Sequence, residues 1–249
     1  MIIIKNHNEI TLMKKAGRIV GETLLLLEKE VKPGVTTADL DRMAEEFITK
    51  HGAKPSFKGL YGFPSSLCVS VNEQVIHGFP GAYVLKEGDI VSIDCGAFFD
   101  GFHGDAARTF PVGNISIDAQ KLIDITRESF FRGISFAKEG NKLTDISYGI
   151  QSYVEAAGFS VVRDFVGHGI GRKVHEDPNV PNFGKFGRGP KLLEGMVLAI
   201  EPMVNAGTHK VKTLKDGWTV VTADSSLSAH YENTVAILSD GPEILTLIK

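Results

Sequence analysis

The sequence repeats itself once, and this internal repeat limits the folds that the chain can adopt. Amphipathic helices and strands resemble one another whatever their origin, so a single match would leave a chance likeness open. Two matches occur here in the same order and at nearly one spacing, which favours a duplication. They pair residues 34–52 with 140–158, at an offset of 106, and residues 85–94 with 192–201, at an offset of 107. We therefore expect two pseudo-symmetric halves, approximately 1–115 and 116–249.

Helices and strands are expected in blocks. Apolar residues at helical spacing, with capping residues and glycines at their ends, predict helices over 8–30, 36–52, 116–138 and 143–157. β-rich runs predict strands over 66–71, 83–85, 96–110, 159–166, 197–204, 218–222 and 231–238. Because the two element types do not alternate one for one, the sequence predicts an α+β fold, with a mainly antiparallel sheet and its helices on one side. No linker-like segment separates the halves, so residues 1–249 are expected to form a single domain.

The charge balance excludes several classes of binding protein. The 249 residues include 27 basic and 30 acidic side chains, a net charge of -3, and carry no basic stripe. We therefore expect neither a nucleic acid nor an anionic membrane as partner. The two cysteines, Cys68 and Cys95, are too few for a disulfide framework, and the apolar N-terminal run is too short for a signal sequence. These observations predict a cytoplasmic protein.

Carboxylates occupy matching places in the two halves. Asp94 is expected to end an apolar strand and Glu201 to end its counterpart. Taken singly, each acid could be a turn or capping residue, but four carboxylates at one place repel one another unless cations lie between them. Two divalent ions would supply this charge, as in dinuclear hydrolytic sites. The second acid of each half has a histidine two residues before it, in His103-Gly104-Asp105 and His230-Tyr231-Glu232.

A glycine-rich run offers a histidine for such a site. In the segment 167–172, of sequence GHGIGR, small neighbours leave the imidazole of His168 unobstructed. A dinucleotide-binding fingerprint is the rival interpretation, but Arg172 stands at the place of its third glycine and Pro178 disfavours a following helix. The two cysteines lie in apolar runs, so we interpret them as buried hydrophobic residues rather than nucleophiles.

The second half is longer near its acids. Asp94 and Asp105 are 11 positions apart, whereas Glu201 and Glu232 are 31 apart. The second copy therefore holds 20 additional residues, among them the only tryptophan, Trp218. We expect this insertion to form a wall of a substrate site.

Further motifs accompany these acids. They are Asn72-Glu73-Gln74-Val75-Ile76-His77-Gly78, His175-Glu176, Glu201-Pro202, Lys215-Asp216-Gly217-Trp218 and Tyr231-Glu232-Asn233-Thr234. With these residues the chain resembles the type I methionine aminopeptidases of the pita-bread metallopeptidase superfamily, over nearly its whole length. The resemblance implies a pita-bread fold, in which two halves related by a pseudo-two-fold axis build a central, mainly antiparallel sheet covered by helices. It also implies that residues 1–249 form one catalytic domain.

The resemblance implies a dinuclear metal centre. Asp94 and Asp105 would hold one divalent ion, and Asp105, His168, Glu201 and Glu232 would hold the other, with Asp105 and Glu232 bridging. Such ions lower the pKa of bound water and polarise a carbonyl group. Manganese, iron, cobalt and zinc all remain open, because affinity order and cellular supply favour different metals.

The resemblance also implies catalytic and substrate-binding residues. Glu201 would accept a proton from the attacking water, and His77 and His175 would contact the scissile peptide. Leu60 and Val174 stand where aromatic residues are often found in the family. The implied pocket for the methionine side chain consists of Phe57, Leu60, Phe63, Cys68, Val174 and Trp218.

The function implied by the resemblance is removal of the initiator methionine from nascent proteins that carry a small second residue. Nascent N-termini and peptides would be the substrates, with transient proximity to the ribosome, and the protein is expected to be a monomer. The alternative is an X-Pro aminopeptidase or prolidase on the same scaffold, towards which Asp94-Cys95-Gly96 and Ala107-Arg108-Thr109-Phe110 lean. A non-catalytic interaction protein is less favoured, because all five ligands are present.

Overall fold

Four long helices begin close to the predicted positions. The structure is a computed structural model that describes residues 1–248. Its helices are α1 (His7–Glu30), α2 (Thr37–Lys50), α3 (Ile117–Ile134) and α4 (Leu143–Ala156). Thr36 and Asp39 form the expected capping box, in which each side chain accepts a hydrogen bond from the other residue's backbone. Helix α3 ends four residues before the predicted 138. Among the described residues no helix has the length and apolar character needed to cross a membrane.

The strands are short, and every pairing between them in residues 1–248 is antiparallel. The hydrogen-bonded ladders form four sheets, in the orders β1-β4-β2 with β5 on β4, β13-β10-β6, β11-β12-β3 and β15-β14-β9-β7-β8. The strands are β1 (Lys54–Pro55), β2 (Leu67–Val71), β3 (Gln74–Ile76), β4 (Ile90–Phe99), β5 (Phe102–Pro111), β6 (Ser160–Val161), β7 (Gly167–Gly169), β8 (Glu176–Val180), β9 (Val197–Ile200), β10 (Met203–Asn205), β11 (Val211–Thr213), β12 (Val220–Thr222), β13 (Ser228–His230), β14 (Asn233–Leu238) and β15 (Gly241–Ile244), with a short 3-10 helix, η1 (Leu60–Gly62).

The predicted strand over 96–110 was wrong, because the chain reverses inside it. Strands β4 and β5 form a hairpin whose turn contains Asp100 and Gly101, with φ of 47° and 84°. Two residues with positive φ give the turn that fits the twist of a two-residue hairpin. The sequence analysis expected Asp94 to end a strand. That prediction was wrong, because Asp94 lies in the middle of β4.

Three other strand predictions were too long. Residues 83–85 contribute only one isolated bridge, between Val84 and Thr36. Of residues 159–166, only 160 and 161 are in a strand. The predicted strand over 197–204 is broken between β9 and β10 at Glu201-Pro202, where proline lacks the N–H that a ladder needs.

The internal repeat is present in the backbone hydrogen bonds as well as in the amino-acid sequence. Gly34 N donates to Leu85 O at 2.9 Å, and Gly140 N donates to Leu192 O at 2.9 Å. These are the same contacts displaced by 106 and 107 residues. The isolated bridges, Thr36 with Val84 and Lys142 with Lys191, are displaced in the same way. The pseudo-symmetric fold predicted from the sequence is therefore confirmed.

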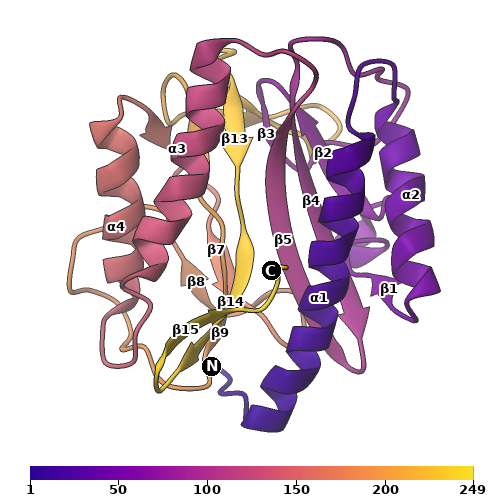
Figure 1. The fold of residues 1–249 in the computed structure, drawn as a ribbon. Coiled ribbons are helices and arrows are strands. Elements are labelled where there is room, and N and C mark those ends of the chain that lie inside the picture. The colour runs from indigo at the N-terminus through magenta and orange to yellow at the C-terminus, as the bar shows by residue number, and fades with distance from the viewer. Residues whose placement is uncertain (249) are drawn as a thin grey trace.

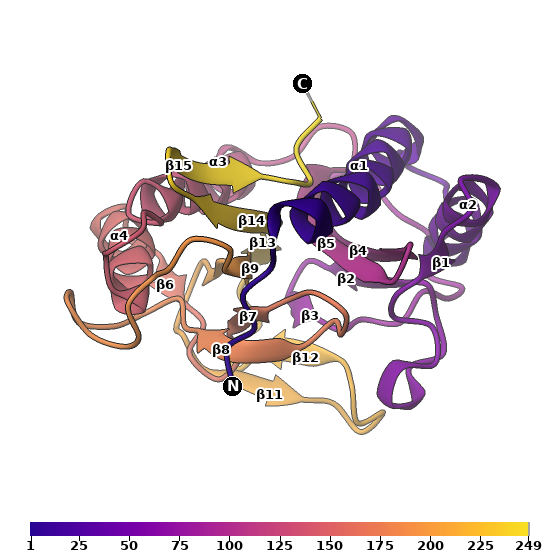
Figure 2. The same ribbon diagram turned by 90° about the horizontal axis from the view of Figure 1, so that it is seen from below.

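The helices cover one face of the strands. Seen from below, α1 and α2 pack over the sheet of the first half and α3 and α4 over strands of the second, while β11 and β12 lie on the far side (Figures 1 and 2). Each half contributes its own large apolar core, one centred on residues such as Leu40 and Ile93, the other on residues such as Phe130 and Ile146.

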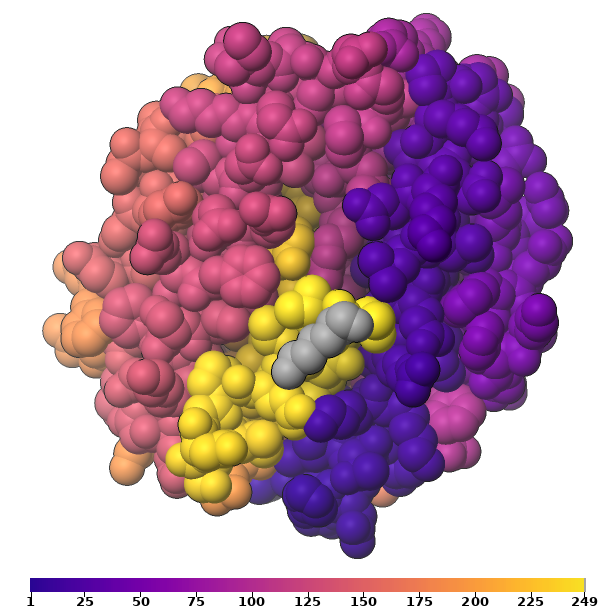
Figure 3. Space-filling view, viewed as in Figure 1, coloured from indigo at the N-terminus to yellow at the C-terminus, as the bar shows by residue number. Residues whose placement is uncertain are grey.

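A hollow of about 350 Å³ between α1 and α3 reaches down to Tyr231 (Figure 3).

The close packing of α1 on β5 depends on facing glycines. A Cβ atom added to Gly104 would lie 2.7 Å from the backbone nitrogen of Gly17. We expect Gly104→Ala to lower the free energy of unfolding by about 1 to 3 kcal/mol, because the helix must move away from the strand. Urea denaturation would measure the change. Gly81→Ala is the matched control, since a Cβ there meets nothing within 4 Å; equal stability losses in both variants would contradict the prediction.

Candidate active site

A cavity of about 940 Å³ lies between the two halves and is lined by residues from both. All five predicted metal ligands line it. So do His77, His175 and every residue of the predicted side-chain pocket except Val174. Trp218, from the insertion of the second half, also forms part of its wall, as predicted.

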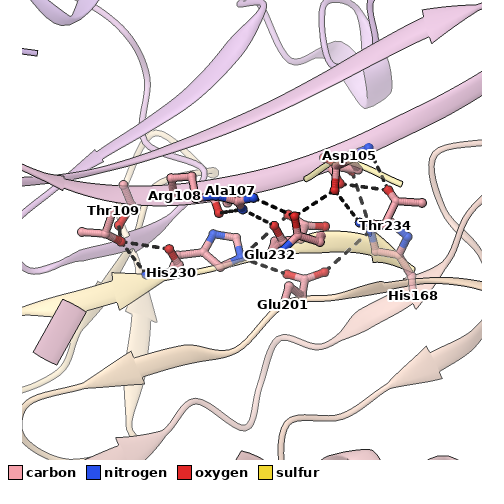
Figure 4. A network of polar contacts seen from close by, with 12 residues as sticks. Asp105, Ala107, Arg108, Thr109, His168, Glu201, His230, Glu232 and Thr234 are labelled. Atoms are coloured by element: carbon pink, nitrogen blue, oxygen red, sulfur yellow. Dashed lines mark hydrogen bonds and ion pairs between the residues drawn. The ribbon is translucent and has the colours of Figure 1, made fainter. Parts of the chain in front are cut away.

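The acids meet because neighbouring strands carry them. In the first half, Asp94 on β4 pairs with Ala107 on β5, two positions from Asp105. In the second half, β9 and β14 pair so that Glu201 follows one strand and Glu232 precedes the other. The two halves join where Ala107 and Glu232 exchange backbone hydrogen bonds of 3.3 and 2.9 Å (Figure 4). One short pairing across the pseudo-axis thus places acids of both halves side by side.

His168 faces this group of acids. Its Nε2 lies 3.7 Å from Glu201 Oε1 and 3.9 Å from Asp105 Oδ2 (Figure 4). Its Nδ1 lies 2.9 Å from Gly169 O, a contact that fixes the ring and leaves Nε2 free for a ligand. Asp105, His168 and Glu232 each offer one atom, and these atoms lie within 4.8 Å of one another. One imidazole and several carboxylates therefore point at a common centre.

Burial shifts the pKa values of the four acids and of His168 away from their ordinary values. It raises the pKa of Asp94 to about 7, and it raises the pKa of Asp105 and Glu232, to which the negative charges of neighbouring carboxylates add. The pKa of Glu201 is raised by burial and by the charge of Asp94. Burial lowers the pKa of His168 to about 4, so its imidazole is neutral at physiological pH and available to a metal.

The oxygen atoms of the acids lack the partners that buried polar atoms normally have. Asp94 Oδ1, Asp105 Oδ1 and Glu232 Oε1 are buried and have no hydrogen-bond partner within residues 1–248. Such orphaned oxygens require compensation, which a cation supplies. A donor set of carboxylates with one neutral imidazole suits hydrolytic divalent metals. The residues present therefore fit a divalent metal centre.

The glycines around His168 allow close approach of the backbone, as expected for small residues at these positions. A Cβ on Gly167 would collide with Ala199 O on the neighbouring strand, and a Cβ on Gly169 would collide with Asp177 O. Strand β7 therefore approaches β8 and β9 closely, and the buried His168 lines the cavity. The motif therefore allows tight strand contacts and does not act as a phosphate-binding loop.

The two predicted peptide-contacting histidines border the acids. His175 is exposed, and its ring packs edge-on against that of His168, with centroids 4.6 Å apart. His77 has a φ of 59°, a costly conformation for a side-chain-bearing residue that is typical of functional sites. Its ring is edge-on to Phe165 and Trp218. Burial lowers the pKa of His77 to about 4.

The residues of the predicted side-chain pocket form one apolar cluster. Its buried members include Val174 and Cys68, and Trp218 packs against them. Phe79 belongs to the cluster and was missed by the sequence analysis; it lies two residues after His77, a spacing that could have drawn attention to it. Tyr61 was missed too, although glycines on both sides of Leu60-Tyr61 marked a tight turn. Its hydroxyl lies 3.4 Å from Nδ1 of His175.

The remaining residues singled out in the sequence have other surroundings. His103 does not line the cavity, and its Nδ1 instead lies 2.8 Å from Ser56 Oγ. His230 is buried behind the acids, with Nε2 3.6 Å from Glu201 Oε2. Cys68 and Cys95 are free and buried, as predicted.

Comparison with known proteins agrees with this geometry. The model of metallopeptidase family M24 matches residues 11–239. The chain belongs to this family. Over the full length of both chains this M24 protein is 77% identical to a methionine aminopeptidase from Clostridium perfringens. It matches the crystal structure of a methionine aminopeptidase from Thermotoga maritima with a TM-score of 0.98 and 48% identity, over the whole of both chains.

A more distant structural match shows the fold alone. The prolidase from Pyrococcus furiosus matches with a TM-score of 0.81 at 24% identity, over 99% of this chain and 66% of the prolidase. The predicted membership of the pita-bread superfamily, and its α+β fold, are therefore confirmed.

Metal binding should depend on pH in a direction set by the acids. A carboxylate whose pKa is raised in the folded state stabilises the fold at low pH, and this contribution is lost as pH rises through the folded pKa. Because the pKa of Asp94 is about 7 in the folded protein, its stabilising contribution is lost as the pH rises towards 7. At about pH 8 Asp94 is therefore ionised and can bind a cation, whereas at about pH 5.5 its bound proton competes with the metal. We expect Mn²⁺ to raise the Tm of metal-stripped protein more at the higher pH.

Differential scanning fluorimetry with and without Mn²⁺ would measure this difference. The variant Asp94→Asn/Glu232→Gln should lose most of the Mn²⁺-induced shift. Asp216→Asn, which alters an exposed acid, is the control and should keep it. Equal shifts at both pH values in the wild-type protein would show that the acids do not hold the metal.

Proposed function

We propose that this protein is a methionine aminopeptidase that removes the N-terminal methionine from proteins and peptides with a small second residue. The observation that carries the proposal is the group of four buried carboxylates and His168 at the floor of a cavity with an apolar side pocket. The names of the full-length relatives support the same assignment. The substrates we propose are nascent chains in the cytoplasm, with the enzyme acting as a monomer.

The proposed centre holds two divalent ions. The ligands would be Asp94, Asp105, His168, Glu201 and Glu232, because all five line one cavity. Three of them, Asp94, Asp105 and Glu232, carry orphaned oxygen atoms. When bound, two divalent cations supply positive charge that offsets the carboxylates, polarises the scissile carbonyl and lowers the pKa of water. Manganese, iron, cobalt and zinc all suit this donor set.

The protein's own residues then divide the remaining tasks. Glu201 accepts the proton of the attacking water, since its carboxylate lines the cavity, 3.7 Å from His168. His175, at the cavity mouth, donates a hydrogen bond to the carbonyl oxygen as negative charge develops there. His77, which also lines the cavity, contacts the peptide beside Trp218.

The apolar cluster sets the preference for the first residue. It contains Phe57 and Phe63, with Cys68 and Val174 beside them, a surface suited to an unbranched thioether. Leu60 packs against the same cluster. An aromatic side chain at Leu60 or Val174 would narrow this pocket, so the smaller residues leave it wider. X-Pro hydrolysis is the second candidate, because prolidases share the fold.

Peptide preference would test the proposed function. The Mn²⁺- or Co²⁺-loaded protein should cleave Met-Gly-Met and leave Ala-Pro-Ala intact, which liquid chromatography of the products would measure. Met-Gly-Met should also be cleaved at least about tenfold faster than Met-Leu-Met, because a larger second side chain has to be accommodated beside the metal centre. Cleavage of Ala-Pro-Ala with sparing of Met-Gly-Met would establish the X-Pro alternative instead.

Substitution of Glu201 would test its role as base. We expect Glu201→Gln to lower kcat by about 100-fold or more while the Tm stays close to that of the wild type, because the amide cannot accept the proton. Glu194→Gln, an exposed acid shortly before the same strand, is the matched control. Mn²⁺ affinity measured in parallel separates loss of the base from loss of metal. Wild-type turnover in Glu201→Gln would remove this residue from the mechanism.

A further inference from the structure

A buried ion pair outside the metal centre lies directly beside His175. Lys5 Nζ lies 2.7 Å from Glu176 Oε2, and both side chains are only 3% exposed. Lysine is among the residues least often buried, and a buried pair is weak evidence for added stability. None of the functions assigned above uses this pair, although Glu176 follows His175 in the chain.

The chain is shaped to receive Lys5. A Cβ on Gly171 would lie 2.6 Å from Lys5 Cε and 2.8 Å from Glu176 Oε1, so only glycine leaves room for the ion pair. Lys5 Nζ also donates to Ile3 O at 3.1 Å, and the backbone nitrogen of Lys5 donates to Gly195 O at 2.8 Å. The segment before α1 is therefore fixed against the loop that bears His175.

Glu176 transmits this anchoring to the loop. Its Oε1 accepts a hydrogen bond of 3.2 Å from the backbone nitrogen of Lys173, which closes the loop around His175. Gly171 N donates to Lys173 O at 3.1 Å, and Gly171 O accepts from His103 N at 2.8 Å. The backbone on both sides of His175 is thus held. The exposed ring itself packs edge-on against His168, and within residues 1–248 its one hydrogen-bond contact is the 3.4 Å contact to Tyr61.

We infer that Lys5 is a positioning residue, which through its ion pair with Glu176 holds the backbone of His175 at the distance that the reaction requires. The inference rests on the proposed function, since it assigns His175 to the substrate carbonyl. Uncharged side chains of similar volume can replace a buried pair without loss of stability, but they would lack the directional contacts to Ile3 O and Lys173 N. A displacement of about 1 Å at a reacting group can lower a rate about 100-fold.

A double-mutant cycle would test this inference on the full-length, Mn²⁺-loaded protein. Lys5→Met should lower kcat for Met-Gly-Met by about 10- to 100-fold in the wild-type background, and should cause no further loss in the His175→Ala background. Mn²⁺ affinity should stay unchanged in both. Lys14→Met, which removes an exposed ion pair with Glu243, is the matched control and should leave kcat unchanged. Equal losses from Lys5→Met in the two backgrounds would overturn the inference.

Two further measurements keep the test decisive. Lys5→Met/Glu176→Met removes the charges together and carries the test if the single variant does not fold; failure of both to fold would assign the pair to stability and overturn the inference. The ¹H–¹³C resonance of the His175 ring, identified with His175→Ala, should shift in the Lys5 variant and stay in place in the Lys14 control. An unmoved resonance would also overturn it. If the wild type does not cleave Met-Gly-Met, the proposed function fails, yet this resonance still reports whether Lys5 positions His175.

Discussion

The desolvation of four carboxylates is the constraint on which the rest of the structure depends. A buried acid without compensation is strongly unfavourable, and here Asp94, Asp105, Glu201 and Glu232 share one location. The fold brings them there because the strands that carry them pair with one another, and backbone hydrogen bonds between Ala107 and Glu232 join the two halves. Buried oxygen atoms of three of the four acids lack hydrogen-bond partners and the imidazole of His168 is neutral, so a positive charge between these groups is needed to stabilise them.

The repeat made much of the fold predictable. The four helices begin within a residue of their expected positions, because capping residues such as Thr36 mark their starts locally. Strand ends were predicted less well, since pairing depends on partners that are distant in the sequence. The Asp100-Gly101 turn was a local signal that was overlooked, and the break at Pro202 follows from a missing backbone donor. The division into four sheets could not be inferred from periodicity, which says nothing of register.

The site was predictable where its chemistry requires particular residue types, and less so where only shape matters. The carboxylates and His168 were found because charge repulsion and paired spacing distinguish them from ordinary acids. Phe79 joins the apolar pocket through tertiary packing, and its position two residues after His77 was the one local sign of this. Lys5 was missed for a related reason, because its partner Glu176 lies 171 residues away in the sequence.

The proposed metal ligands come from both halves, and this has a consequence for the mechanical integrity of the molecule. Each half has its own apolar core, whereas the contact between Ala107 and Glu232 and the shared acids lie at the seam. Cations bound at the proposed site would therefore link the two halves across that seam, without stabilising either core directly. When metal is scarce, loosening should start along the line where the two halves touch, and protection from hydrogen exchange should fall there before it falls inside either half.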